Sequence, residues 1–253
     1  MRIKGAALIA ATLGLAVVII SPGILAQQPD SAAAKPAEKK SDSYVSYKAK
    51  SVKSVWGDKK TIRMQGEVVF THEDTVISSD QVDYDDVAKT ALSAATIKIT
   101  NPECDVTGDK GSAYFRKKLG VVEGNVVMLL KPKKEASDTS AGKDSVDKFK
   151  QDTTVTCARI EYFYGQKLAS AQGNVVFKQQ KRTAYADKAV YDQKAELLTL
   201  TGNAHATDED GQTFTAPGEV KISLKKGDEW MEGSNASGKV KIDLGEENAG
   251  EKK

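Results

Sequence analysis

The residues of this chain that could perform chemistry are few and widely spread. Asp80, Asp109 and Asp187 each begin a short stretch that ends in a tyrosine. Aspartates on stacked β-rungs serve as acids and bases in carbohydrate-cleaving β-helix enzymes. Here, however, the aspartates recur with a sequence repeat and stand beside turns, where a carboxylate caps backbone N–H groups. We therefore expect turn residues, with a carbohydrate-active β-helix enzyme as a minor alternative.

The histidines form no metal motif. His72 and His205 are the only two, and neither has a second histidine at helical or strand spacing. The chain also lacks a Gly-Lys-Ser/Thr phosphate loop, a serine nucleophile elbow and a paired-cysteine metal motif. The sequence therefore predicts no catalytic residue, no metal and no cofactor, so we expect a protein that is not an enzyme.

The charge balance excludes nucleic acid as a partner. Lys plus Arg number 37 against 35 for Asp plus Glu, and the two signs are interspersed, so there is no broad basic field. Aromatic residues make up only 6% of the chain. The remaining apolar residues are mostly small or β-branched, a mixture that favours strands.

The N-terminal segment of the chain predicts export, and polar stretches mark the limits of the folded part. Residues 1–26 read as a signal peptide, with an uncleaved membrane anchor as the alternative, so the rest of the chain is expected outside the cytoplasm. Residues 27–43 are a low-complexity linker, and residues 245–253 are a charged tail. The folded part is then 44–244, with a polar insertion at 131–152.

An internal repeat organises the folded part. Glycines followed by alternating apolar residues recur at Gly66, Gly124, Gly173 and Gly202, with further copies beginning at Ala95 and Gly238. Successive spacings are 29, 29, 49, 29 and 36 residues, and the longest interval contains the polar insertion. Asparagine follows three of these glycines, which we interpret as fixing a bend because both residue types tolerate unusual backbone angles. Repeats of this length must stack to bury their apolar faces.

The alternation places a defined set of side chains on one face. Residues two and four after each repeat glycine are apolar, and a period of two puts them on the same side of a strand. With two leucines that precede Gly202, the inward set is Val68, Phe70, Ile97, Ile99, Val126, Met128, Val175, Phe177, Leu198, Leu200, Val240 and Ile242. No segment shows helical periodicity. The sequence thus predicts an all-β fold: an elongated β-jellyroll or β-solenoid whose end rungs expose unpaired backbone.

The two cysteines, Cys104 and Cys157, are expected to be free and buried. The repeat also carries tyrosines at 84, 114, 162 and 191, which could form a ladder along one face. Cys104 lies ten residues before Tyr114 and Cys157 five before Tyr162, and this offset of five residues separates the sulfurs by about 16 Å along the strands. A disulfide stays open as an alternative if the insertion between them changes the register.

The repeated phrases resemble those of a known family. Ala171-Gln172-Gly173-Asn174-Val175, Glu123 to Val126 and Ala186 to Asp192 are similar to the signature of the OstA-like superfamily, which includes lipopolysaccharide-transport proteins of the LptA and LptC types. The resemblance implies a half-open β-jellyroll whose groove accepts the acyl chains of lipopolysaccharide. The inward set would then be lipid-binding. It also implies a role in outer-membrane assembly, with other OstA-like proteins or further copies of the chain joined by edge-strand pairing into a bridge across the periplasm.

Two alternatives remain beside this transport hypothesis. One is a structural envelope scaffold whose closed core binds no lipid, and the other is the β-helix enzyme already mentioned. The number of repeats, the insertion at 131–152 and the linker at 27–43 depart from a short single-domain pattern, and they leave open whether the chain is of the LptA type or the anchored LptC type.

Overall fold

The structure is a computed structural model that describes residues 45–131, 152–225, 228 and 230–241. The expected signal peptide, linker and tail, and nearly all of the polar insertion, lie outside the described residues. What is described is almost entirely β-structure, with one short 3-10 turn, η1 (Phe115–Lys117). The all-β prediction is confirmed.

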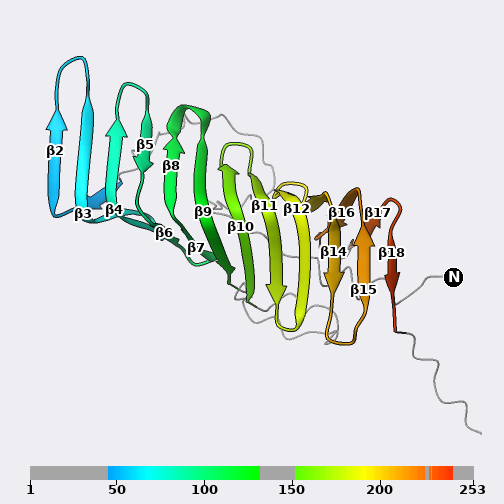
Figure 1. Cartoon of the computed structure of the whole chain (residues 1–253). Helices are drawn as coiled ribbons and strands as arrows, with labels where there is room; N and C mark the ends of the chain where they lie inside the picture. Colours follow the sequence, from blue (N-terminus) through cyan, green and yellow to red (C-terminus); the bar gives the residue numbers. More distant parts are fainter. Residues whose placement is uncertain (1–44, 132–151, 226–227, 229, 242–253) are drawn as a thin grey trace, which may run out of the picture.

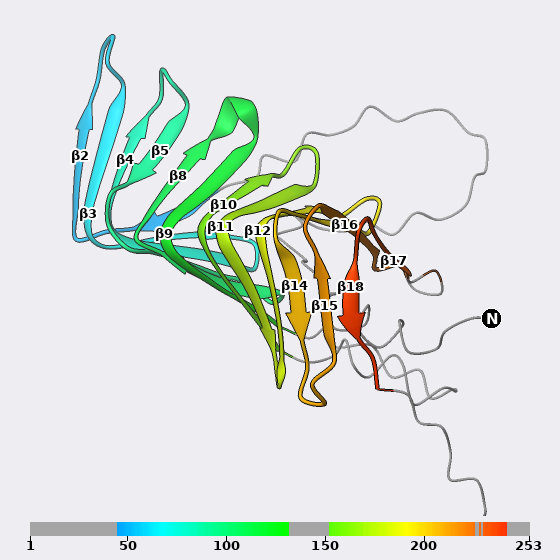
Figure 2. The ribbon, with the colours of Figure 1, turned by 45° about the vertical axis from the view of Figure 1, so that its right-hand side comes forward.

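The strands form one continuous antiparallel sheet that is folded lengthwise into two wings (Figures 1 and 2). Six long strands run through both wings: β3 (Thr61–His72), β4 (Thr75–Asp85), β9 (Leu119–Leu130), β10 (Thr153–Phe163), β11 (Leu168–Gln179) and β12 (Arg182–Asp192). Wing 1 adds β1 (Ser46–Lys48), β6 (Ile97–Thr100), β7 (Cys104–Gly108), β14 (Ala204–Thr207), β15 (Thr213–Ala216) and β18 (Ser237–Lys239). Wing 2 adds β2 (Ser51–Val55), β5 (Thr90–Ser93), β8 (Lys110–Tyr114), β13 (Leu197–Thr201), β16 (Glu219–Ser223) and β17 (Trp230–Gly233).

The fold line passes through the repeat glycines. Gly124 and Asn125 have φ of 76° and 44°, and Gly202 and Asn203 have φ of 76° and 49°. Two consecutive left-handed residues turn the strand sharply, and glycine and asparagine adopt that conformation at the lowest cost. The pairing of β3 with β4 shifts register across the same line, between Gln65 and Val68. The prediction that these asparagines fix a bend is confirmed.

The last repeat bends at a different residue from the one expected. Gly238 lies inside β18 and pairs with Phe214, and the left-handed residue between β17 and β18 is Asn235, with φ of 53°. The assignment of Gly238 as the final repeat glycine was therefore wrong, because the Gly233–Ala236 segment takes that place. An added Cβ at Gly238 would lie 2.2 Å from the carbonyl oxygen of Thr213, so a close strand approach explains this glycine.

Strands that follow one another in the sequence lie near one another in the sheet, so the two edges of the sheet come from opposite ends of the described sequence (Figure 1). β1 and β2 form the N-terminal edge, pairing with β3. β17 and β18 form the C-terminal edge, pairing with β16 and β15. Within the described residues no helix is long and apolar enough to cross a membrane.

Candidate functional site

The inner face of wing 1 carries an unbroken apolar ladder. Strand pairing places the following residues opposite one another in turn, from the N-terminal edge onward: Tyr47, Phe70, Ile77, Ile99, Val106, Met128, Val155, Phe177, Ala184, Ala206 and Phe214. Paired residues in a sheet share a face, so these side chains all point between the wings. A second row, closer to the fold line, includes Val68, Ile97, Val126 and Val175, which are all buried.

Wing 2 carries a matching ladder that faces wing 1. In pairing order it consists of Ile62, Tyr84, Ala91, Ala113, Gly120, Tyr162, Ala169, Tyr191, Leu198, Ile222 and Met231. Leu200 lies in the neighbouring row, opposite Ala189 and Val220. The space between the two wings is therefore lined by apolar side chains over the whole length of the sheet.

Ten of the twelve residues in the inward set line this interior. Val68, Ile97, Val126, Met128, Val175, Phe177, Leu198 and Leu200 are buried, while Phe70 and Ile99 are half-buried. Val240 instead follows β18 and is 38% exposed, because the last bend is at Asn235. Ile242 lies outside the described residues.

Sequence reasoning missed about half of the interior. Ile77, Val106, Val155 and Ile222 belong to strands that carry no repeat glycine. Each of these four residues pairs directly with a residue of the inward set. They could therefore have been identified from antiparallel pairing with the inward set, because the glycine motif does not mark them.

The repeat tyrosines do not form one ladder. Tyr84, Tyr162 and Tyr191 are inward, but Tyr114 pairs with Thr90 and Leu119 on the outer face. Its place in the inner ladder is taken by Ala113. The cause is a slip of one residue, since Tyr114 lies five residues after Asp109 whereas Tyr191 lies four after Asp187.

The C-terminal half of the interior is closely packed. Most of the buried side chains from Ile97 to Ile222 belong to one cluster. The cavity there has a volume of about 20 Å³ and is lined by residues that include Met128, Phe177, Tyr191 and Leu198. That is room for about one water molecule, whereas sites for drug-sized ligands measure roughly 300–1,000 Å³. Burial raises the pKa of Tyr162 and of Tyr191 to about 12.

The N-terminal half is more open. Its core is a separate small cluster of Met64, Val68 and Val82. The side chains packed against it, Ala49, Ile62, Phe70 and Ala91, are only half-buried, and Ile77 and Ile99, which pack against the large cluster, are half-buried too. From β5 to β9 the inner ladder of wing 2 has small residues, Ala91, Ala113 and Gly120. An added Cβ on Gly120 would meet no atom within 4 Å. We call the space beside Gly120, whose neighbours in the wing-2 ladder are Ala113 and Tyr162, the Gly120 opening.

The recurring aspartates stabilise bends. The Asn125 amide donates a hydrogen bond to Asp109 Oδ2 at 2.8 Å, and the Asn203 amide donates one to Asp187 Oδ2 at 2.9 Å. At the bend of β3 a salt bridge of 2.6 Å between Lys50 and Glu67 replaces this pair. The carboxylates also lie directly against the glycines, since an added Cβ on Gly202 would be 2.3 Å from Asp187 Oδ2. This explains the motif without catalysis.

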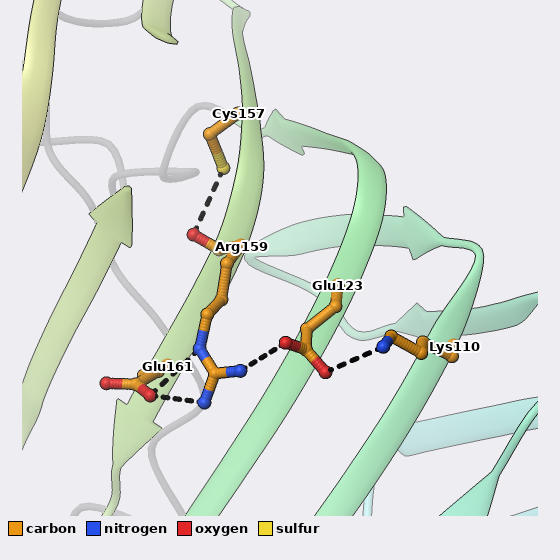
Figure 3. A network of polar contacts seen from close by, with 5 residues as sticks. All are labelled: Lys110, Glu123, Cys157, Arg159 and Glu161. Carbon is orange, nitrogen blue, oxygen red and sulfur yellow. Dashed lines mark hydrogen bonds and ion pairs between the residues drawn. The ribbon is translucent and has the colours of Figure 1, made fainter. Parts of the chain in front are cut away.

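Beside one bend a polar network crosses three strands (Figure 3). Arg159 forms ion pairs with Glu123 and, at 2.5 Å, with Glu161, while Lys110 lies 3.5 Å from Glu123. Burial raises the pKa of Glu123, but the hydrogen bond and charge of Arg159, together with Lys110, outweigh this and leave the pKa below its usual value. The network clamps β8, β9 and β10 together on the face opposite the apolar ladder.

The remaining candidate residues are inert. Cys104 and Cys157 are free and buried, as predicted, and burial raises the pKa of each thiol to about 11. His205 is exposed and stacks on Tyr185, with ring centroids 4.3 Å apart. The described residues contain no cluster of His, Cys, Asp and Glu that could hold a metal ion.

Comparison with known proteins identifies the family. The family model of the LptA/(LptD N-terminal domain) LPS transport protein matches residues 46–227. This chain belongs to that family. It is therefore a periplasmic protein of lipopolysaccharide transport, and proteins of this LptA/LptD family are transport components, not enzymes. The matched range covers all but the last strands of the folded sheet.

Two further comparisons add little. One similar structure is the crystal structure of LptH from Pseudomonas aeruginosa, which is described as the LptA-homologous periplasmic component of the lipopolysaccharide transport device. Its sequence is 18% identical to this chain. The match covers 47% of this chain and 75% of that one, with a TM-score of 0.38. No curated protein matches this sequence. The fold assignment rests on the strand pairing described above and the family match.

Proposed function

We propose that this protein binds the acyl chains of lipopolysaccharide between its two wings and shields them from water during transport to the outer membrane. The observation that carries the proposal is the Gly120 opening. It provides free space within the apolar ladder of wing 2, inside a protein of the lipopolysaccharide-transport family. Exposed apolar surface lining a concave region favours an apolar ligand.

The proposed lipid-binding residues fall into two groups. Phe70 and Ile99 are half-buried, so part of each side chain is accessible for direct contact. Met128, Phe177 and Leu198 lie in the packed region, so acyl chains would reach them only if the wings separated. The close packing of this second region favours the scaffold alternative for the C-terminal half, in which these side chains serve stability alone.

We also propose that the protein joins other OstA-like proteins, or copies of itself, through its edges to bridge the inner and outer membranes. Every residue of β2 is exposed, and the side chains of Tyr47, Val52 and Val55 are 57%, 43% and 44% exposed. An edge strand with free backbone groups and apolar side chains is suited to strand addition from another chain.

Filling the Gly120 opening tests lipid binding without disturbing the packed core. In Gly120→Trp the indole would occupy the free space, so we expect the fold to persist and lipopolysaccharide binding to fall at least tenfold. Gly218→Trp is the matched control, because an added Cβ there also meets no atom within 4 Å but Gly218 is exposed near the C-terminal edge. Native mass spectrometry after incubation with lipopolysaccharide measures bound lipid. Full binding by Gly120→Trp, or no lipid on the unaltered protein, would favour the scaffold.

A charge on the edge strand tests bridging. Val52→Lys places a cation on the N-terminal edge, so we expect weaker self-association or weaker association with another OstA-like protein in sedimentation velocity. Val127→Lys is the control, since Val127 is similarly exposed, at 41%, but lies in a central strand. If both variants associate like the unaltered protein, edge pairing through β2 is wrong.

A further inference from the structure

The first four hairpin turns of wing 2 each carry one exposed apolar side chain, whereas the next turn, residues 193–196, has none. Consecutive turns between β2 and β3, β4 and β5, β8 and β9, and β10 and β11 have one each: Trp56, Val87, Phe115 and Tyr164. Their exposed fractions are 84%, 54%, 49% and 37%. These turns line the upper side of the sheet in Figure 1. We call residues 56–60, 86–89, 115–118 and 164–167 the wing-2 turn edge.

The same turns are basic. They contain Lys59, Lys60, Lys89, Arg116, Lys117, Lys118 and Lys167, against Asp58 and Asp86. Asp86 is already paired with Lys89 at 2.5 Å, and it also accepts a hydrogen bond from Tyr84. Since hairpins in one sheet repeat about every 10 Å, the edge is a strip roughly 30 Å long with cations and apolar side chains interleaved.

The turns of wing 1 have the opposite character. The wholly described turns there, residues 73–74, 101–103, 180–181 and 208–212, contain Glu73, Asp74, Glu103, Asp208, Glu209 and Asp210 but only one cation, Lys181. None of them has an exposed large apolar side chain. Although the whole chain is nearly neutral, the turns of the wing-2 turn edge are therefore basic and the described turns of wing 1 are acidic.

We propose that the wing-2 turn edge docks on the surface of an anionic lipid bilayer. Aromatic side chains prefer the headgroup level of a membrane, where their apolar rings are buried, and lysines beside them are attracted to anionic lipids. The acidic turns of wing 1 are repelled by the same surface. This charge difference orients the protein so that the turns of wing 2 contact the membrane.

The orientation has a consequence for the interior. The Gly120 opening lies between the same hairpins whose turns form the edge: Ala91 follows the turn of Val87, and Gly120 follows the turn of Phe115. Phe115 itself contacts Tyr84 of the inner ladder, with ring centroids 6.0 Å apart. Docking would place the open part of the interior within one short strand of the lipid headgroups. The docking itself does not depend on lipopolysaccharide binding.

Vesicle flotation of the full chain lacking residues 1–26 tests the proposal. We expect binding to vesicles of phosphatidylcholine with 30% phosphatidylglycerol, at least tenfold weaker binding to phosphatidylcholine alone, and a loss of binding at high salt. Lys59→Glu/Lys117→Glu should weaken binding at least tenfold. Lys98→Glu/Lys181→Glu, which makes the same change in net charge on wing 1, should bind like the unaltered protein.

Tryptophan fluorescence gives a second readout. In a Trp230→Phe variant, Trp56 is the remaining tryptophan, and its emission should shift to the blue on anionic vesicles. Failure to bind anionic vesicles, an equal loss in both charge variants, or an unshifted Trp56 would overturn the proposal. Because the vesicles contain no lipopolysaccharide, these results are separable from those of the Gly120→Trp experiment.

Discussion

The bend motif makes a quantitative prediction that two glycines allow us to isolate. Gly202 and Gly211 have nearly the same φ, 76° and 75°. An alanine Cβ at Gly202 would lie 2.3 Å from Asp187 Oδ2, whereas at Gly211 it would meet nothing within 4 Å. Both substitutions therefore carry the same left-handed backbone cost, but only Gly202→Ala adds a clash with the carboxylate.

The backbone cost for an L side chain is about 1–2 kcal/mol, offset by about 0.4–1 kcal/mol from the less flexible unfolded chain. We therefore expect Gly211→Ala to lower the free energy of unfolding by about 1 kcal/mol. Overpacking adds about 1–3 kcal/mol, so Gly202→Ala should lower it by about 2–4 kcal/mol. Equilibrium urea unfolding followed by far-ultraviolet circular dichroism measures both values.

Removing the carboxylate should rescue part of the loss. Asp187→Ala alone deletes an exposed hydrogen bond from Asn203 and should cost about 0.5–1.5 kcal/mol. Combined with Gly202→Ala, it also removes the clash. The free energy of unfolding of the double variant should therefore fall by less than the sum of the two single losses. Equal losses for Gly202→Ala and Gly211→Ala, or strict additivity with Asp187→Ala, would refute the idea that aspartate and glycine are matched at the bend.

Three further predictions concern the interior and its outer clamp. Phe177→Asp buries a charge in the packed half and should lower the melting temperature sharply, whereas Phe70→Asp, at a half-buried position, should keep the fold and lose lipid. The thiol pKa of Cys104 is raised from 9.0 to about 11 by burial, so the folded state holds the proton more tightly. Its contribution to stability is complete below pH 9 and is lost as the pH rises toward 11, and Cys104→Ala should flatten that decline in pH-dependent unfolding. Arg159→Gln removes a half-exposed clamp, and we expect a loss of less than about 1 kcal/mol at pH 7. The loss should shrink below pH 4.5 as Glu123 is protonated, since its lowered pKa stabilises the fold only above that range; an unchanged loss at pH 3 would contradict this.

The sequence predicted the interior well where one residue type reports directly on the backbone. Gly124 and Gly202 mark left-handed bends that few other residues adopt at low cost, and strict alternation then assigns the following side chains to the inner face. The prediction failed at Gly238 for the same reason: a glycine is also required where strands approach closely, as at the carbonyl of Thr213. Spacing alone does not distinguish these two causes.

The unequal filling of the interior was not predictable from the identity of the inward residues. Phe70 and Phe177 occupy equivalent places in the wing-1 ladder, yet one is half-buried and the other is 5% exposed. Phe70 packs against the small cluster of Met64, Val68 and Val82 near the N-terminal edge, whereas Phe177 belongs to the large cluster. Between β5 and β9 the inner ladder of wing 2 presents Ala91, Ala113 and Gly120, which leave space, while farther along it presents Tyr162, Tyr191 and Leu198, which fill it.

The filling of the interior determines which part of the protein can respond to a ligand. In the C-terminal half, a ligand would have to displace well-packed side chains and separate the wings, at the cost of the contacts that hold them together. Beside Gly120 that packing is absent, since an added Cβ would meet no atom within 4 Å, so an apolar ligand there gains contacts and breaks few. A single large side chain at position 120 should therefore mimic the ligand: we expect Gly120→Leu to leave the free energy of unfolding unchanged or raised, whereas a loss of more than about 1 kcal/mol would mean that the region is already filled.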